Sequence, residues 1–152
     1  MAFKHLFKAQ LNWFSTPKES TRFVKNHTIS IHGKEILQVS AAKVFKGDPS
    51  LYNPEDLLLS SVVSCHMMSY LYVCGQNGIE VLSYIDEAEA TLEVNENGSG
   101  RFVEVRLFPK VVIRQKEKIA LANELHTKAN ELCFIANSCS FPIVHESCCE
   151  VV

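Results

Sequence analysis

NPEDLLLSSVVSCHMMSYLYV, residues 53–73, is the stretch that decides the fold of this chain. Asn53 is a preferred residue for capping a helix N-terminus, and Pro54 suits the first helical position. The charges of Glu55 and Asp56 favour the positive end of the helix dipole. The pattern therefore predicts a long helix that begins directly after Asn53.

This predicted helix is apolar on most of its sides. Such helices are buried, so we expect it to be central, packed against a sheet, a second helix or a partner subunit. Asn77-Gly78 is typical of a helix C-terminus. Serine and histidine side chains interrupt the apolar run, so it lacks the roughly 18 apolar residues that a membrane span needs.

Alternating segments typical of β-strands lie on both sides of the helix. Those before it are 3–14, 28–32 and 35–40. After it, residues 81–95 and 101–114 alternate around a turn-forming cluster, and we expect them to form one long antiparallel hairpin. Helical spacing over 116–136 predicts a second helix, and a strand around Ile143 closes the chain.

The order of elements is strands, long helix, long hairpin, helix and final strand. This order predicts an α+β fold with mainly antiparallel strands, formed by a single domain over residues 1–152. No glycine-rich phosphate loop is present, which argues against a doubly wound nucleotide-binding fold.

Composition narrows the class of protein. A chain of 152 residues with 47% hydrophobic and 21% charged residues is long enough to bury a core without staples. The net charge of -2 gives no electrostatic reason to bind nucleic acid. The first ten residues lack the apolar run of a signal peptide, so we expect a cytoplasmic protein whose six cysteines are mostly reduced.

Two of these cysteines, Cys65 and Cys133, lie in segments predicted to be helical and are candidates for dithiol redox chemistry. A thiolate can attack a peroxide O–O bond to give a sulfenic acid, which condenses with a second thiol to a disulfide. The residues alone leave a second interpretation open, because free cysteine is among the most buried residue types. Both thiols would then be inert parts of the core.

The surroundings of both cysteines are similar to known motifs. Residues 53–57, Asn-Pro-Glu-Asp-Leu, with Cys65 ten residues after Glu55, resemble the first cysteine motif of the OsmC/Ohr family of thiol-dependent hydroperoxide reductases. Cys133, with Asn137 shortly after it, resembles the second motif. The order of elements also matches that family over nearly the whole chain.

The resemblance implies roles for four residues. Cys65 would be the peroxidatic cysteine and Cys133 the resolving cysteine. Glu55 matches the family's glutamate, which holds an arginine that activates the thiolate. Arg22 lies in the N-terminal region where the family carries that arginine.

The resemblance also implies a reaction and its partners. Organic hydroperoxides would be reduced to alcohols through a Cys65–Cys133 disulfide, without a metal or organic cofactor. Electrons would come from a dithiol, either a small molecule or a protein of the lipoyl or thioredoxin type. The family's intertwined homodimer has its sites at the interface. An unbroken helix would separate Glu55 from Cys65 by ~15 Å, so we expect Glu55 to act in the partner's site.

Two positions depart from the family pattern. Phe134 follows Cys133 where proline is common, and His66 follows Cys65 where an aromatic residue is common. These differences indicate a distinct branch. His66 also lies about 100° around the helix from Cys65, which makes it a poor general base for that thiol.

The remaining cysteines support no metal site. Cys139, Cys148, Cys149 and His145 lack the spacing of zinc ligands, and adjacent residues on a strand point to opposite faces. Cys74, near the end of the long helix, is expected in the core. Two other functions stay open: a non-catalytic homodimeric domain that binds a small apolar ligand, and a redox sensor whose disulfide changes partner binding.

Overall fold

The computed structural model describes residues 2–15 and 24–152. The chain divides into two compact units, residues 1–58 and 59–152. Each unit is described by itself below, and helix α1 (Pro54–Gln76) begins in the first unit and continues through the second.

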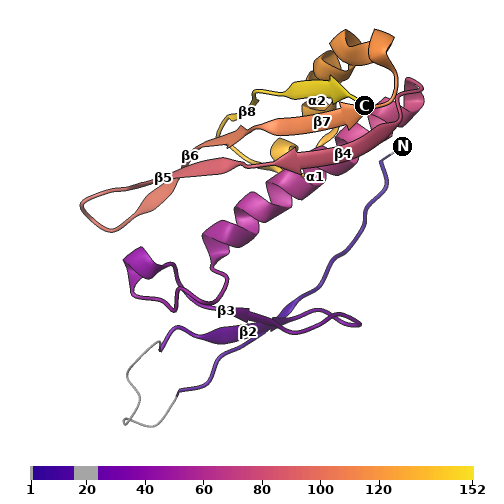
Figure 1. The fold of residues 1–152 in the computed structure, drawn as a ribbon. Helices are drawn as coiled ribbons and strands as arrows, with labels where there is room; N and C mark the ends of the chain where they lie inside the picture. Colours follow the sequence, from indigo (N-terminus) through magenta and orange to yellow (C-terminus); the bar gives the residue numbers. More distant parts are fainter. Residues whose placement is uncertain (1, 16–23) are drawn as a thin grey trace. The chain divides into compact units, whose positions relative to one another are not determined.

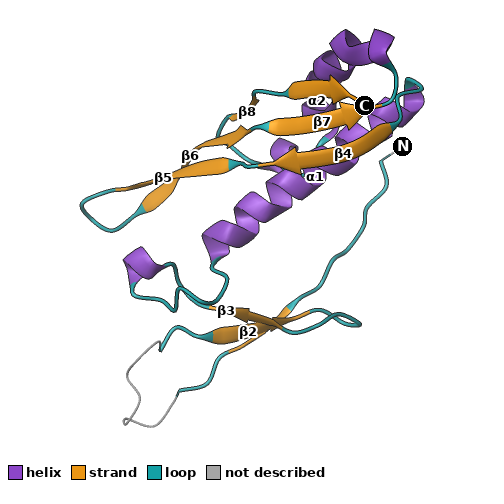
Figure 2. Ribbon diagram, viewed as in Figure 1, coloured by secondary structure: helices purple, strands orange, loops and turns teal. Residues whose placement is uncertain are grey.

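The first unit is a small antiparallel sheet. Its strands are β1 (Gln10–Asn12), β2 (His27–Ser30) and β3 (Leu37–Val39), in the order β1-β2-β3 (Figure 2). The 3₁₀ helix η1 (Lys43–Phe45) follows. All three strands are shorter than predicted, because β1 and β3 each pair with β2 over only three residues.

Apolar side chains of this unit are strongly exposed. Phe3, Leu6, Phe7 and Phe14 each expose between 81% and 90% of their surface. Both hydrophobic core clusters consist of residues from the second unit. Among its described residues, the first unit therefore presents apolar, largely aromatic surface without a core cluster of its own.

Helix α1 begins and ends as the sequence predicts. The backbone N–H of Asp56 donates to Asn53 Oδ1 at 2.8 Å, which caps the N-terminus. At the other end Gly78 has a φ of 64°, and the N–H of Ile79 donates to the carbonyl of Cys74 at 2.9 Å. This is a Schellman motif, which glycine favours because it has no Cβ.

One face of α1 is buried and the other is not, so the expectation of burial on most sides is only partly right. Val62, Cys65, His66 and Tyr70 are among the buried residues. On the opposite face, large apolar side chains such as Met68 remain exposed. The helix is long and apolar enough to cross a membrane by length and composition alone, a test that core helices of water-soluble proteins also pass.

The predicted long hairpin is divided into two ladders. Strand β5 (Glu89–Val94) pairs with β6 (Gly100–Leu107), whereas β4 (Val81–Asp86) pairs with β7 (Pro109–Ile113) (Figure 1). At the break Asp86 Oδ1 accepts the N–H of Phe108 at 2.8 Å. A side chain thus replaces a ladder hydrogen bond there, and Pro109 has no N–H to extend the β6 ladder.

Two C-terminal strands complete these sheets. Strand β8 (Ile143–His145) lies parallel to β6, and β9 (Cys148–Val151) lies parallel to β7. The sheet orders are β5-β6-β8 and β4-β7-β9. The sequence predicted the first of these strands and an overall α+β fold, but not the parallel pairing.

The second predicted helix is shorter than expected. A 3₁₀ turn, η2 (Lys116–Lys118), leads into α2 (Ile119–Leu132), and another, η3 (Ala136–Ser138), follows. Cys133 is the C-cap of α2, with an extended backbone at φ −71° and ψ 110°. The prediction that this cysteine lies within a helix was therefore wrong.

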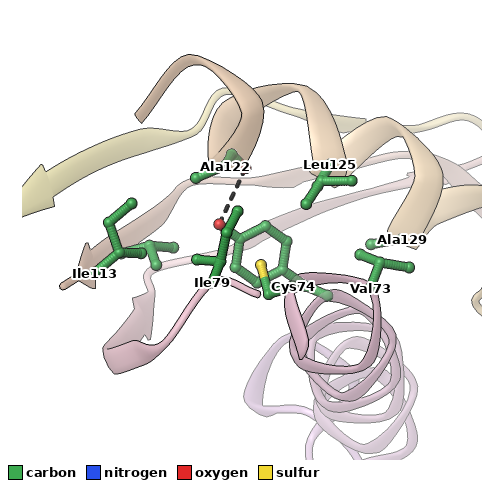
Figure 3. Packing of buried hydrophobic residues seen from close by; sticks show 9 residues of the cluster. Val73, Cys74, Ile79, Ile113, Ala122, Leu125 and Ala129 are labelled. Atoms are coloured by element: carbon green, nitrogen blue, oxygen red, sulfur yellow. Dashed lines mark hydrogen bonds between the residues drawn. The ribbon is translucent and has the colours of Figure 1, made fainter. Parts of the chain in front are cut away.

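The larger core cluster joins α1, α2 and the β4-β7-β9 sheet. Tyr70, Val73 and Cys74 of α1 meet Ile113 of β7 and Ala122 of α2, as Figure 3 shows for the labelled members. The Tyr70 hydroxyl donates to the carbonyl of Ala122 at 3.0 Å. Cys74 is fully buried, as predicted. Helices α1 and α2 therefore share a packed interface; α1 carries Cys65, and Cys133 directly follows α2.

Candidate active site

Cys65 lies on α1 at the floor of an apolar cavity of about 410 Å³. The cavity is lined by Cys65, Met68, Ser69, Tyr72, Leu132 and Phe134. The Cys65 side chain keeps about 9% of its surface exposed, whereas Phe134 exposes 82% at the side of the cavity. Helical spacing explains the α1 contribution, because residues 68 and 69 lie three and four positions after Cys65, and residue 72 lies four and three positions after them.

Cys133 lies next to Cys65 and is completely buried. The two thiols are close enough to influence each other's titration, and both are free. Burial, followed by the influence of Cys65, raises the pKa of the Cys133 thiol to about 11. The N–H of Ala136 donates to Cys133 Sγ at 3.4 Å and opposes that rise. The structure thus brings together two cysteines that are far apart in the sequence.

Glu55 lies in the first turn of α1. Its Oε2 is buried and has no hydrogen-bond partner among the residues that the structure describes. A buried carboxylate oxygen without a donor is costly. The first turn of α1 is therefore ready to accept a cation or another donor.

The predicted arginine, Arg22, lies outside the described residues. The sequence contains three other arginines. Arg106 pairs with Glu146, and Arg114 donates to Glu80 at 2.7 Å. Arg101 lies beside the turn between β5 and β6, in a hollow that Cys65 does not line. Two of these three arginines are thus held by glutamates, and the third lies at a different hollow of the surface.

A buried histidine cluster lies beside this site and was missed in the sequence. His66 Nε2 and His126 Nδ1 are 3.0 Å apart, and the ring of Tyr70 stacks on His126 at 3.9 Å between centroids. Burial lowers the pKa of His66 to about 4 and that of His126 to about 3. The ring of His145 lies 5.9 Å from that of His66.

A sequence signal for this cluster did exist. His126 lies between Ala122 and Ala129 at helical spacing, and His66 precedes Tyr70 by four residues. Both histidines therefore lie on the buried faces of their helices. They were not recognised because a histidine in an amphipathic pattern is compatible with either face.

The other thiols occupy different surroundings. Cys148 is exposed, and Cys139 and Cys149 are partly buried. Within residues 2–15 and 24–152, no three histidine, cysteine or acidic side chains are arranged to hold a metal ion. The chemistry that this geometry offers is therefore that of two adjacent thiols, one of which faces an apolar cavity.

Known proteins are similar to this chain in sequence and in fold. The family model described as OsmC-like protein matches residues 47–147. The uncharacterized protein YmaD of Bacillus subtilis is 25% identical over 109 residues, which covers 70% of this chain and 72% of YmaD.

Solved structures with a similar fold cover nearly the whole chain. An OsmC-like protein of unknown function from Vibrio cholerae superposes with a TM-score of 0.85 and 27% identity, covering 95% of this chain and 100% of that one. An organic hydroperoxide resistance protein from Elizabethkingia anophelis has the same fold, with a TM-score of 0.72, 18% identity and full coverage of both chains. The chain belongs to the OsmC-like protein family.

Proposed function

We propose that this protein is a thiol-dependent peroxidase that reduces organic hydroperoxides to alcohols. The observation that carries the proposal is the position of Cys65, which faces an apolar cavity with Cys133 close beside it. An apolar cavity suits the organic part of a hydroperoxide. The name of the Elizabethkingia anophelis relative, an organic hydroperoxide resistance protein, agrees with this function.

The cycle consists of three balanced steps. The Cys65 thiolate attacks the hydroperoxide, the O–O bond breaks, and the alcohol leaves with a proton while Cys65 becomes a sulfenic acid. Cys133 then attacks the sulfur of Cys65, and water leaves as the disulfide forms. A dithiol reductant returns two electrons and becomes a disulfide itself. The cycle requires no metal or organic cofactor.

The first step needs a cation near the Cys65 thiolate. We assign this role to Arg22, held by Glu55. The Oε2 of Glu55, which has no partner among the described residues, supports the assignment. Two of the other arginines are paired with Glu146 and Glu80, and the third lines a separate hollow.

We further propose a homodimer in which Glu55 of one subunit serves Cys65 of its partner. Ten residues of continuous α1 separate the two residues, or ~15 Å. The exposed aromatic residues of the first unit, such as Phe7 at 90%, offer a surface for a second copy. A monomer that retained full activity would contradict this assembly. We place the protein in the cytoplasm, where its six cysteines would stay reduced.

The experiment that tests the function is consumption of cumene hydroperoxide with dithiothreitol. We expect turnover by the wild type and by Cys148→Ser, a control that removes an exposed thiol outside the site. Cys65→Ser should abolish turnover, and oxidised wild type should contain a Cys65–Cys133 disulfide by peptide mapping. Absence of turnover with several hydroperoxides and dithiols would overturn the proposal. Reversible disulfide formation without turnover would point to a redox sensor. The absence of both disulfide formation and turnover would point to a domain that binds an apolar ligand.

A further inference from the structure

The turn that follows Cys133 directs backbone N–H groups at its sulfur. Ala136 is the first residue of η3, and its N–H donates to Cys133 Sγ at 3.4 Å. The N–H of Ile135 also lowers the pKa of this thiol. The turn is closed by hydrogen bonds from Asn137 N–H to the Cys133 carbonyl and from Ser138 N–H to the Ile135 carbonyl, both 3.0 Å. The two donors are thus fixed by backbone geometry.

Access to the two cysteines is unequal. Cys65 lines the cavity, whereas Cys133 is completely buried and does not line it. A thiolate attacks a disulfide along the axis of the S–S bond, so it must approach the sulfur from the side opposite the leaving sulfur. Of the two sulfurs, the one that lines the cavity is that of Cys65.

We propose that the incoming reductant attacks the sulfur of Cys65 and that Cys133 leaves as a thiolate held by the N–H groups of Ile135 and Ala136. This inference rests on the proposed function, because it concerns the reduction of the Cys65–Cys133 disulfide. The Cys65–Cys133 bond breaks, a bond between the reductant sulfur and Cys65 forms, and the electron pair goes to Cys133. The second thiol of the reductant then releases Cys65, and the reductant ends as a disulfide.

Two effects oppose each other at Cys133. Burial raises the pKa of its thiol to about 11, and a thiol of high pKa is a slow leaving group. The two N–H groups lower that pKa, because a donor stabilises a thiolate more than a thiol. Access favours attack on Cys65, since Cys133 is completely buried and does not line this cavity. The N–H groups then stabilise the Cys133 thiolate that leaves when Cys65 is attacked.

Trapping the intermediate tests the direction of attack. The full-length protein is oxidised with diamide, its remaining thiols are blocked with N-ethylmaleimide, and glutathione is added briefly before an acid quench. Iodoacetamide then labels the thiol that was freed. We expect glutathione on Cys65 and the new label on Cys133, and the reverse pattern would overturn the proposal. Because diamide replaces the hydroperoxide, the result does not depend on peroxidase turnover, and failure to form the disulfide would also overturn it.

Ala136→Pro tests the N–H groups. Proline at position 136 removes the N–H that donates to sulfur. Because Ile135 has an αR backbone, which a following proline disfavours, the melting temperature of the variant is measured as well. We expect disulfide reduction by glutathione to slow about tenfold, which corresponds to about 1.4 kcal/mol. In the Cys65→Ser background, the pKa of Cys133 should rise.

Ser138→Ala is the matched control, because it removes a hydrogen bond of the same turn to the Phe134 carbonyl and leaves the sulfur contacts intact. We expect its reduction rate to equal that of the wild type. If Ala136→Pro melts at the wild-type temperature and is reduced equally fast, the N–H groups have no role. If it melts lower, Ala136→Ser, which keeps the N–H, should be reduced at the wild-type rate; a slow Ala136→Ser would overturn the proposal.

Discussion

His66 Nε2 and His126 Nδ1 lie 3.0 Å apart in the interior of the second unit, with both side chains almost completely buried. One ring nitrogen therefore donates and the other accepts, so the pair is stable when both rings are neutral. His66 Nδ1 and His126 Nε2 have no hydrogen-bond partner among the described residues. A proton added to either ring would be buried without compensation.

This arrangement predicts acid sensitivity. Burial lowers the pKa of His66 to about 4 and that of His126 to about 3, below the ordinary value of 6.5 that applies when the chain is unfolded. Protons therefore favour the unfolded state, and stability is complete above pH 6.5 and is lost as the pH falls toward 4. We expect His66 alone to account for on the order of 3 kcal/mol between pH 7 and pH 4. Urea unfolding at a series of pH values measures this loss.

His126→Phe keeps a ring to stack on Tyr70 and removes one titrating group. The pH dependence of its unfolding free energy should be shallower than that of the wild type. His32→Gln, which changes an exposed histidine, should leave the dependence unchanged. Equal slopes for the wild type and His126→Phe would show that other groups cause the acid sensitivity.

Two glycines near the C-terminus of α1 should respond oppositely when alanine replaces them, one change lowering and the other raising the stability of the protein. Gly78 has a φ of 64°, and a Cβ there would lie 3.1 Å from Lys118 Nζ, so Gly78→Ala should destabilise the protein by about 1 kcal/mol. Gly75 lies within the helix, and a Cβ there would meet nothing within 4 Å. Gly75→Ala should therefore stabilise the protein by about 0.5–1 kcal/mol. Chemical denaturation checks both, and a stabilising Gly78→Ala would contradict the assigned cap.

The proposed dimer predicts complementation between two inactive variants. Glu55→Gln and Cys65→Ser subunits, mixed after unfolding and refolding, should form heterodimers in which one site contains both native residues. Random mixing in equal amounts should restore roughly a quarter of wild-type peroxidase activity, because half of the dimers are mixed and each has one complete site. If Glu55 acts within its own subunit, mixing restores nothing. Each variant refolded alone is the control.

We expect Phe134 to make the enzyme favour bulky hydroperoxides, because its ring lines the cavity. Its side chain lines the cavity but is 82% exposed, so truncation should hardly affect folding. Phe134→Ala should raise the KM for cumene hydroperoxide about three- to tenfold, through the loss of apolar contact, and change that for tert-butyl hydroperoxide less. Leu82→Ala, which truncates a 39% exposed apolar side chain on β4 outside the cavity, should leave both constants unchanged. Equal effects on both substrates would argue against contact with the organic group.

Local signals in the sequence were reliable where they depend on neighbouring residues. Asn53 and Pro54 correctly predicted the start of α1, and Gly78 correctly predicted its end. The extent of the other elements was less predictable. A strand lasts only as far as its partner, so β1 is limited to three residues by its register with β2. The second helix stops before Cys133, where the extended backbone of this residue ends it.

The sequence by itself determined the long helix, the α+β class and the resemblance of both cysteine segments to the family, because capping, alternation and motif spacing are local properties. Tertiary structure alone decided that Cys65 lies near Cys133, that Cys65 and not Cys133 lines the apolar cavity, and that His66 meets His126. These relationships depend on how α1 and α2 pack on one sheet. Packing joins residues far apart in the chain, and no local pattern records which of them will meet.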